Sequence, residues 1–155
     1  MNTFNLSTFF KSLQAIHGGS MLSVIFISLL LFINIKEDLQ LNFEGDRTFM
    51  FMAIIIGYGG KFVGKMMFIR LMRQLPFKAG LSLKTEKYKV AHIVRLVLLK
   101  IPAFMCLYFA FVTKNSFYFI VIALLLFMML TVFPSRNRFS EEVALNNDEK
   151  TQLFR

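Results

Sequence analysis

The stretch "AHIVRLVLLKIPAFMCLYFAF", residues 91–111, is apolar over a length that suits a membrane-spanning helix, yet it contains an arginine, a lysine and a proline. A spanning helix needs roughly 17–25 predominantly apolar residues. A charge at the centre of such a helix costs about 2.5–3.5 kcal/mol on insertion scales. The stretch therefore predicts a membrane protein, and it raises the question of what surrounds Arg95 and Lys100.

Three further stretches satisfy the same length test, so the expected spanning segments are residues 13–35, 49–72, 90–112 and 117–133. The composition agrees, because 56% of the 155 residues are hydrophobic, more than the roughly 45–50% of soluble domains. The first stretch could be a cleaved signal peptide, but the sequence "NIKEDLQLNF" at its end has no small-x-small cleavage site. We therefore expect the first helix to be retained. The predicted fold is all-α: an antiparallel four-helix transmembrane bundle over residues 1–133, followed by a polar cytoplasmic tail over 134–155.

The charges of the loops predict the orientation in the membrane. The first loop is mainly acidic, whereas the middle loop sets the single acid Glu86 against six cations: Arg70, Arg73, Lys78, Lys84, Lys87 and Lys89. Cytoplasmic loops carry an excess of Lys and Arg. We therefore expect the middle loop, the N-terminus and the tail in the cytoplasm. We interpret the net charge of +9 as a topology signal beside anionic lipid headgroups, not as a nucleic-acid site, since the sequence lacks aromatic interleaving of the kind that single-strand binders use.

Small residues recur at four-residue spacing in two of the expected helices. The first helix carries Ala15, Gly19 and Ser23, and the second carries Ala53 with Gly57 and Gly60 with Gly64. Such stripes let helix backbones approach closely in lipid. We expect them to form helix–helix contacts within the bundle, and an interface in a homo-oligomer is the alternative.

The nine acids all lie outside the expected spanning segments. We therefore expect no intramembrane cation to have a carboxylate partner at its own depth, which excludes a carboxylate relay for protons or sodium inside the bilayer. The sequence has no Gly-rich phosphate loop, Ser-His-Asp pattern or Cys/His metal spacing. We expect no catalytic site. The leading interpretation is a scaffold, an accessory subunit of a partner membrane protein, or a binder of an anionic lipid or small hydrophobic anion.

Depth distinguishes the two cations of the opening stretch. With a rise of about 1.5 Å per residue, Arg95 lies roughly 7 Å from the cytoplasmic end of its segment, so we expect it to anchor the helix at the interface. Lys100 lies near the midplane, and we expect it to face the bundle interior. There Tyr58, or the Leu98 carbonyl that the nearby proline leaves free, can accept its hydrogen bond. The candidate ligand-binding residues are Lys100, Lys61, Arg95 and Tyr58, and independent snorkelling of the lysines is the alternative.

The only two histidines, His17 and His92, lie near the starts of the first and third helices. Both helices are expected to enter from the cytoplasm, so the imidazoles lie at a similar level. Two imidazoles facing each other across a four-helix bundle can ligate a b-type haem. A haem-binding membrane protein is therefore the alternative function, and otherwise we expect no cofactor and no metal.

The third helix resembles that of a family of small, uncharacterised bacterial four-helix membrane proteins, which reads K-x-x-x-Y-x-x-A-x-I-x-R-x-A-L-x-E-G-P-A-x-F. The matching residues are Lys84, Tyr88, Ala91, Ile93, Arg95, Pro102 and Ala103. The stretches 10–32 and 133–149 are similar to the family's first helix and tail. The resemblance implies a multi-pass protein of the bacterial cytoplasmic (inner) membrane. The family's E-G-P helix is similar to the ion-carrying helix of ATP synthase c subunits, but Lys100 and Ile101 replace its glutamate and glycine.

Overall fold

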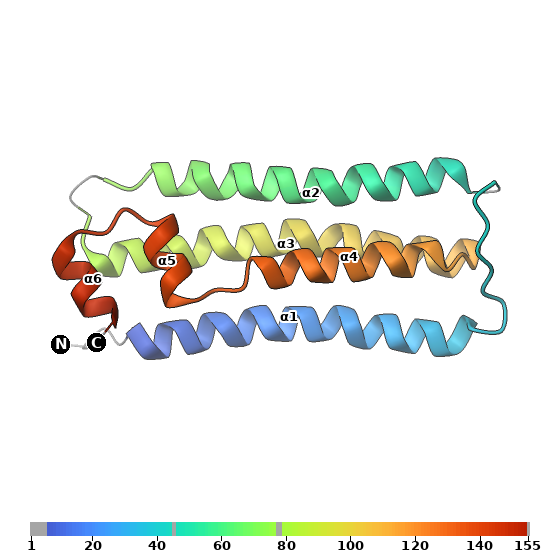
Figure 1. Cartoon of the computed structure of the whole chain (residues 1–155), viewed down its shortest axis with the longest axis horizontal. Helices are drawn as coiled ribbons and strands as arrows, with labels where there is room; N and C mark the ends of the chain where they lie inside the picture. The colour runs from blue at the N-terminus through green and yellow to red at the C-terminus, as the bar shows by residue number, and fades with distance from the viewer. Residues whose placement is uncertain (1–5, 45, 77–78, 155) are drawn as a thin grey trace.

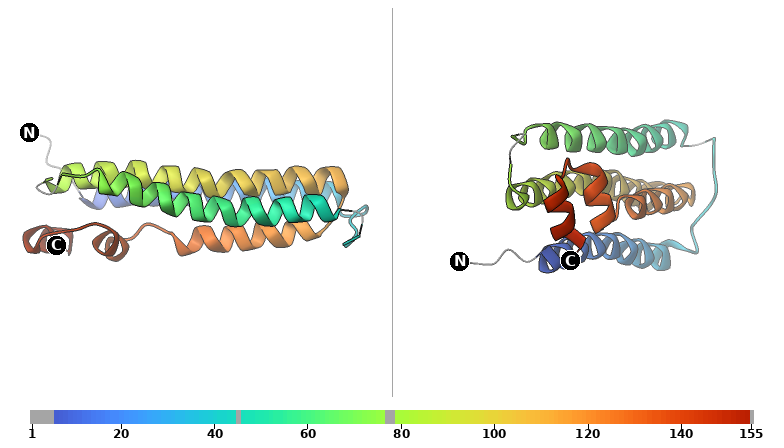
Figure 2. Two further views of the ribbon diagram at one scale, coloured as in Figure 1. Left: turned by 90° about the horizontal axis from the view of Figure 1, so that it is seen from above. Right: turned by 60° about the vertical axis from the view of Figure 1, so that its left-hand side comes forward.

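The computed structural model describes residues 6–44, 46–76 and 79–154, and within them it contains six helices and no strand. This confirms the predicted all-α class. The longer helices are α1 (Leu6–Ile35), α2 (Arg47–Arg73), α3 (Leu81–Thr113) and α4 (Phe117–Thr131), and the short ones are α5 (Arg136–Glu142) and α6 (Asn147–Phe154). The four longer helices lie side by side with alternating chain direction, and α5 and α6 occupy the end where α4 stops short (Figures 1 and 2).

Three of the helices, α1, α2 and α3, are long and apolar enough to cross a membrane. Together, α4 and α5 add a fourth span if the two helices are counted as a single span, although the chain bends by 81° at the short break between them. With 15 residues, α4 alone is about 22 Å long, which is less than the roughly 30 Å of a hydrocarbon core. The bend lies at Pro134, whose ring disfavours helical geometry at the preceding residue.

Two helices begin earlier than the hydropathy pattern predicts, because α1 starts at Leu6 and α3 at Leu81. Hydropathy marks only the apolar part of a helix, whereas the backbone hydrogen bonds continue into the polar sequence before it. The early start of α3 places Lys84 and Tyr88 on the same helix as Arg95. Lys78, another of the predicted loop cations, lies outside the described residues.

The small residues of α2 lie against α3 and α4, as predicted. Ala53, Gly57 and Gly64 are buried. The closest approach is at Gly60, where a methyl group would lie 2.5 Å from the carbonyl oxygen of Leu98 and 2.9 Å from Cγ of Pro102. The helix α2 therefore covers the carbonyl that Pro102, lacking an N–H, leaves without its helical donor.

The corresponding stripe on α1 does not make the contact that we expected within the chain. Ala15 and Gly19 are exposed, and a methyl group on Gly19 would meet no atom within 4 Å. The buried face of α1 instead consists of larger side chains, among them Leu13, His17 and Val24. Small-residue spacing alone thus did not identify which face of α1 is packed.

The contact at Gly60 gives a stability prediction. Helix propensity alone favours alanine over glycine by about 1 kcal/mol. At Gly60 the added methyl collides with backbone, so we expect Gly60→Ala to lower the free energy of unfolding in detergent by about 1–3 kcal/mol, as overpacking does. Gly57→Ala is the matched control, because its methyl would lie an ordinary 3.6 Å from Leu125 Cδ2. Thermal unfolding measures both, and equal melting temperatures would contradict the prediction.

Candidate functional site

Four polar side chains follow one face of α3 at spacings of four, four and three residues: Lys84, Tyr88, His92 and Arg95. We call them the α3 polar stripe. Residues three and four apart are neighbours on a helix surface, so the stripe is continuous. The first three are buried, and the side chain of Arg95 is only 13% exposed. The stripe faces α1 and the tail helices α5 and α6.

Arg95 is bound to the carboxylate of Glu142, the last residue of α5. Its Nη1 lies 3.1 Å from Glu142 Oε1, which also accepts from Arg138 Nε at 3.1 Å, while the Tyr88 hydroxyl donates to Oε2 at 3.1 Å. The guanidinium also lies over the Phe68 ring, 5.4 Å from its centre. The expectation that Arg95 has no carboxylate partner is therefore wrong, whereas its role as an anchor at the membrane interface stays a prediction. The bend after α4 turns the tail back against α3 and brings the acid to it.

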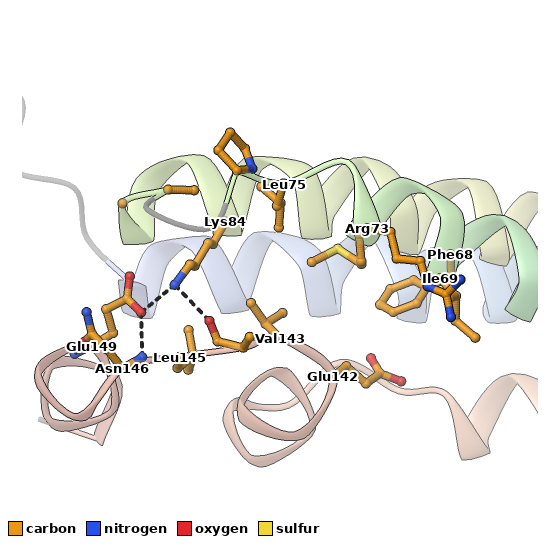
Figure 3. Close-up of a pocket in the computed structure, with 15 residues that line it drawn as sticks. Phe68, Ile69, Arg73, Leu75, Lys84, Glu142, Val143, Leu145, Asn146 and Glu149 are labelled. Carbon is orange, nitrogen blue, oxygen red and sulfur yellow. Dashed lines mark hydrogen bonds and ion pairs between the residues drawn. The ribbon is translucent and has the colours of Figure 1, made fainter.

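Lys84, predicted as a cation of the middle loop, instead lies on α3 and is buried against the tail. Its Nζ lies 2.7 Å from Glu149 Oε2 and 2.8 Å from the Ala144 carbonyl oxygen. The two side chains of the ion pair are 9% and 8% exposed. Figure 3 shows these contacts at one end of a cavity.

Glu149 has a second role at the start of α6. Its carboxylate accepts from the backbone N–H of Asn146 at 2.9 Å, and the Asn146 side chain accepts from the Glu149 N–H at 2.8 Å. This reciprocal pair is a capping box. Burial raises the pKa of the Glu149 carboxyl, but the hydrogen bonds from Lys84 and Asn146 and the charge of Lys84 outweigh it, so the pKa is lowered. Glu149 is therefore an anion at neutral pH.

The two histidines, both buried, lie in direct contact. His17 Nδ1 is 3.0 Å from His92 Nε2, and His17 Nε2 is 3.1 Å from the carbonyl oxygen of Met129. A carbonyl only accepts, so His17 carries its proton on Nε2 and its Nδ1 is the acceptor. His92 must then donate from Nε2. Its Nδ1 has a lone pair and no hydrogen-bond partner within the part of the chain that the structure describes.

This pair does not fit the predicted haem. An iron between two imidazoles would hold their nitrogens about 4 Å apart, twice a metal–nitrogen bond of roughly 2.0–2.1 Å. The facing nitrogens are instead hydrogen-bonded at 3.0 Å, and the other nitrogen of His17 is bound to Met129. The pair is a hydrogen-bonded tie between α1, α3 and α4.

The other predicted ligand-binding residues lie elsewhere. Tyr58 is 62% exposed and Lys61 is exposed, both on α2. Lys100 is half-buried, with Nζ 5.4 Å from the centre of the Phe104 ring. Among the described residues it makes no hydrogen bond to Tyr58 or to the Leu98 carbonyl. The expected interior pocket around Lys100 is therefore absent from this arrangement, because α2 packs directly over the Leu98 carbonyl.

Two adjoining hollows lie near the C-terminal end of α2. A cavity of about 820 Å³ separates α2 and the start of α3 from the tail, with apolar walls that include Met72, Leu75 and Val143. A groove of about 560 Å³ on α2 is lined by Phe62, Lys65, Met66, Ile69, Arg70 and Arg73. Ile69 and Arg73 line both hollows. The groove thus combines three cations and three apolar side chains, and its lining holds no acid.

The sequence interpretation missed the partners that the tail supplies, Glu142, Glu149 and Arg138. Two signals were present. The spacing of Lys84, Tyr88, His92 and Arg95 places four polar groups on one helical face, which predicts a polar partner for that face. The Asn146 and Glu149 spacing is that of a capping box and predicts the start of α6. Neither signal identifies which cation each acid meets.

The carboxylate of Glu142 gives a second stability prediction. Glu142→Gln removes the charge that faces Arg95 and Arg138, so we expect a loss of about 1.5–3 kcal/mol, the range of hydrogen bonds to charged groups. Glu141→Gln is the control, because this neighbouring side chain is exposed and its loss changes the net charge equally. Thermal or denaturant unfolding in detergent measures the difference, and similar losses in both variants would contradict the assigned network.

The histidine pair gives a spectroscopic prediction. We expect the ¹⁵N imidazole signals of both residues to show a protonated Nε2 and a bare Nδ1 at neutral pH, because the Met129 carbonyl fixes the direction of both hydrogen bonds. His92→Phe leaves a single imidazole, which assigns the signals. A bare Nε2 on His17 would show that the chain of hydrogen bonds runs differently.

In comparisons with known proteins, no protein-family model, no curated protein and no solved structure matches the chain.

Proposed function

We propose that the chain is an antiparallel four-helix protein of the bacterial cytoplasmic membrane, with both ends in the cytoplasm, that binds an anionic lipid of the inner leaflet at α2. The proposal involves no catalytic step. The observation that carries it is the basic and apolar groove on α2, together with the adjoining cavity.

The charges at one end of the molecule support the proposed orientation. The turn between α2 and α3 and the tail lie together at the end where α2 finishes (Figure 1). Arg70 and Arg73 lie in the last turn of α2. Basic segments next to spanning helices favour the cytoplasmic side, where the leaflet surface carries anionic lipids.

The ligand class follows from the order of side chains along the groove. Arg70 and Arg73 lie at the end of α2, whereas Phe62 and Met66 lie deeper toward the middle of the helix. Phe62 is about 16 Å from Arg73 along the helix axis. A lipid has the same order, with a phosphate at the surface and apolar chains below it. Arginine suits the phosphate because its planar guanidinium donates two parallel hydrogen bonds.

The strength of the preference can be approximated from the charges. A cation near the membrane surface contributes about 1 kcal/mol toward attracting anionic lipid. Two of the groove's three cations, Arg70 and Arg73, lie in the last turn of α2, so a preference for anionic over zwitterionic lipid of roughly 30-fold is expected. The cavity beside the groove has a volume within the roughly 300–1,000 Å³ of small-molecule sites, which gives part of the lipid room to enter.

Native mass spectrometry of gently solubilised protein tests the proposal. We expect phosphatidylglycerol to be retained in preference to phosphatidylcholine. Arg73→Gln should lower the bound fraction about fivefold, since one surface cation contributes about 1 kcal/mol. Lys61→Gln is the matched control, because Lys61 is an exposed cation on the same helix that lines neither hollow.

Several outcomes would contradict the proposal. Protein without any bound lipid would rule out the proposal. Equal losses of bound lipid in Arg73→Gln and Lys61→Gln would show that the groove does not bind the lipid selectively. A bound partner chain without lipid would favour the scaffold or accessory-subunit alternative.

A further inference from the structure

The tail forms one wall of the cavity beside α2. Six of the lining residues belong to it: Glu142, Val143, Ala144, Leu145, Asn146 and Glu149. The opposite wall comes from α2, from the turn that follows it and from the start of α3. Figure 3 shows Arg73 and Ile69 toward one end of the cavity and the Lys84–Glu149 pair toward the other. Movement of α6 away from α3 would therefore open the cavity.

Both tail helices contribute a fully buried side chain to one apolar cluster, Phe139 from α5 and Leu153 from α6. Phe139 of α5 is fully buried, with edge-on contacts to the Phe10 and Tyr88 rings. Polar contacts hold α6 as well: the Glu149 carboxylate is paired with Lys84 of α3, and Arg136 of α5 donates to the Leu153 carbonyl oxygen at 3.1 Å. The eight residues of α6 are fewer than the roughly 12–15 that an isolated helix needs in water. Its order therefore depends on docking.

The Glu149 carboxylate is paired with Lys84, one of the two cations that line the cavity. Lys84 donates to it at 2.7 Å, and a lipid phosphate offers the same charge and the same kind of acceptor oxygen. Arg73, at the other end of the cavity, makes no ion pair among the described residues. A phosphate that reached the Lys84 end of the cavity would therefore compete with the Glu149 carboxylate for the same ammonium group.

We propose that the tail is a lid on the lipid site, held shut by Glu149 as an internal substitute for the lipid headgroup, and that an anionic lipid which replaces Glu149 on Lys84 releases α6. This inference rests on the proposed lipid binding. Glu149 also closes the capping box with Asn146. Its departure from Lys84 therefore loosens the start of α6 at the same time, so release and unfolding of α6 form one event.

Hydrogen exchange of the tail amides tests the lid. Wild-type protein is reconstituted in nanodiscs of phosphatidylcholine, with or without phosphatidylglycerol, and native mass spectra of the same samples report the bound lipid. We expect the amides of α6 to be protected in phosphatidylcholine and to exchange about tenfold faster, or more, once phosphatidylglycerol is bound, as the loss of a hydrogen bond to a charged group implies. Peptides from α3 should stay protected in both membranes.

Three variants separate the lid from general destabilisation. Glu149→Gln should exchange rapidly at α6 in both membranes and bind phosphatidylglycerol more tightly, because Lys84 is free. Lys84→Gln should open α6 as well but gain no affinity. Asp148→Asn removes the same charge from the same helical turn, but Asp148 is exposed, so it should behave as wild type.

The two proposals fail in different ways. Bound phosphatidylglycerol with unchanged exchange at α6 would overturn the lid and leave the lipid site standing. Absence of bound phosphatidylglycerol would overturn both. Equal exchange at α6 in Glu149→Gln and Asp148→Asn would show that the Lys84–Glu149 pair does not hold the lid.

Discussion

The early end of α4 is the constraint on which the rest of the structure depends. The helix stops at Thr131, after 15 residues, while α1 and α3 continue beside it. The part of α3 that would otherwise lie against α4 carries the polar stripe instead of apolar side chains. Polar groups that are removed from water need hydrogen-bond partners. The tail, turned by 81° after α4, supplies them from the space that α4 leaves.

Two ion pairs join the tail to α3. The two cations on α3 are farther apart in the sequence than the two acids of the tail that they bind. Lys84 and Arg95 are 11 residues apart on a continuous helix, or about 16 Å. Their partners Glu149 and Glu142 are only seven residues apart, and a helix of that length would rise about 10 Å. The chain covers the difference by leaving helical geometry between α5 and α6. A buried ion pair is weak evidence for net stability, so we expect these two pairs to act mainly in setting the position of the tail on α3.

The fold class and the apolar helices could be predicted because apolar length is a local property of the sequence. The packing of Gly57 and Gly64 on α2 was also predictable from spacing. The pairing of Arg95 with Glu142 was not, because it depends on a tail that returns across 47 residues, and the depth argument assumed that all tail acids stay in water. The level shared by His17 and His92 followed from their positions in the sequence. Their direct hydrogen bond depends on how closely α1 and α3 pack, which no local pattern encodes.

The position of Lys100 illustrates the same limit. Its depth in the helix followed from counting residues, but its direction depends on which faces of α3 are covered by neighbours. Because Gly60 brings α2 directly onto the Leu98 carbonyl, the acceptor expected for Lys100 is covered by backbone. The lysine lies beside Phe104 instead. The depth of a residue can thus be counted along the sequence, whereas the direction of its side chain depends on how the helices pack together.

The irregular segment between α5 and α6 is a loop whose length is constrained by the contacts on either side of it. Surface connections ordinarily tolerate insertions and deletions. Here residues 143–146 act as a spacer of fixed span between two acids that must reach two cations on a rigid helix. One residue more or less would move Glu149 past Lys84 while Glu142 stays on Arg95. The least regular part of the tail is therefore the part whose length can vary least among functional sequences of this kind.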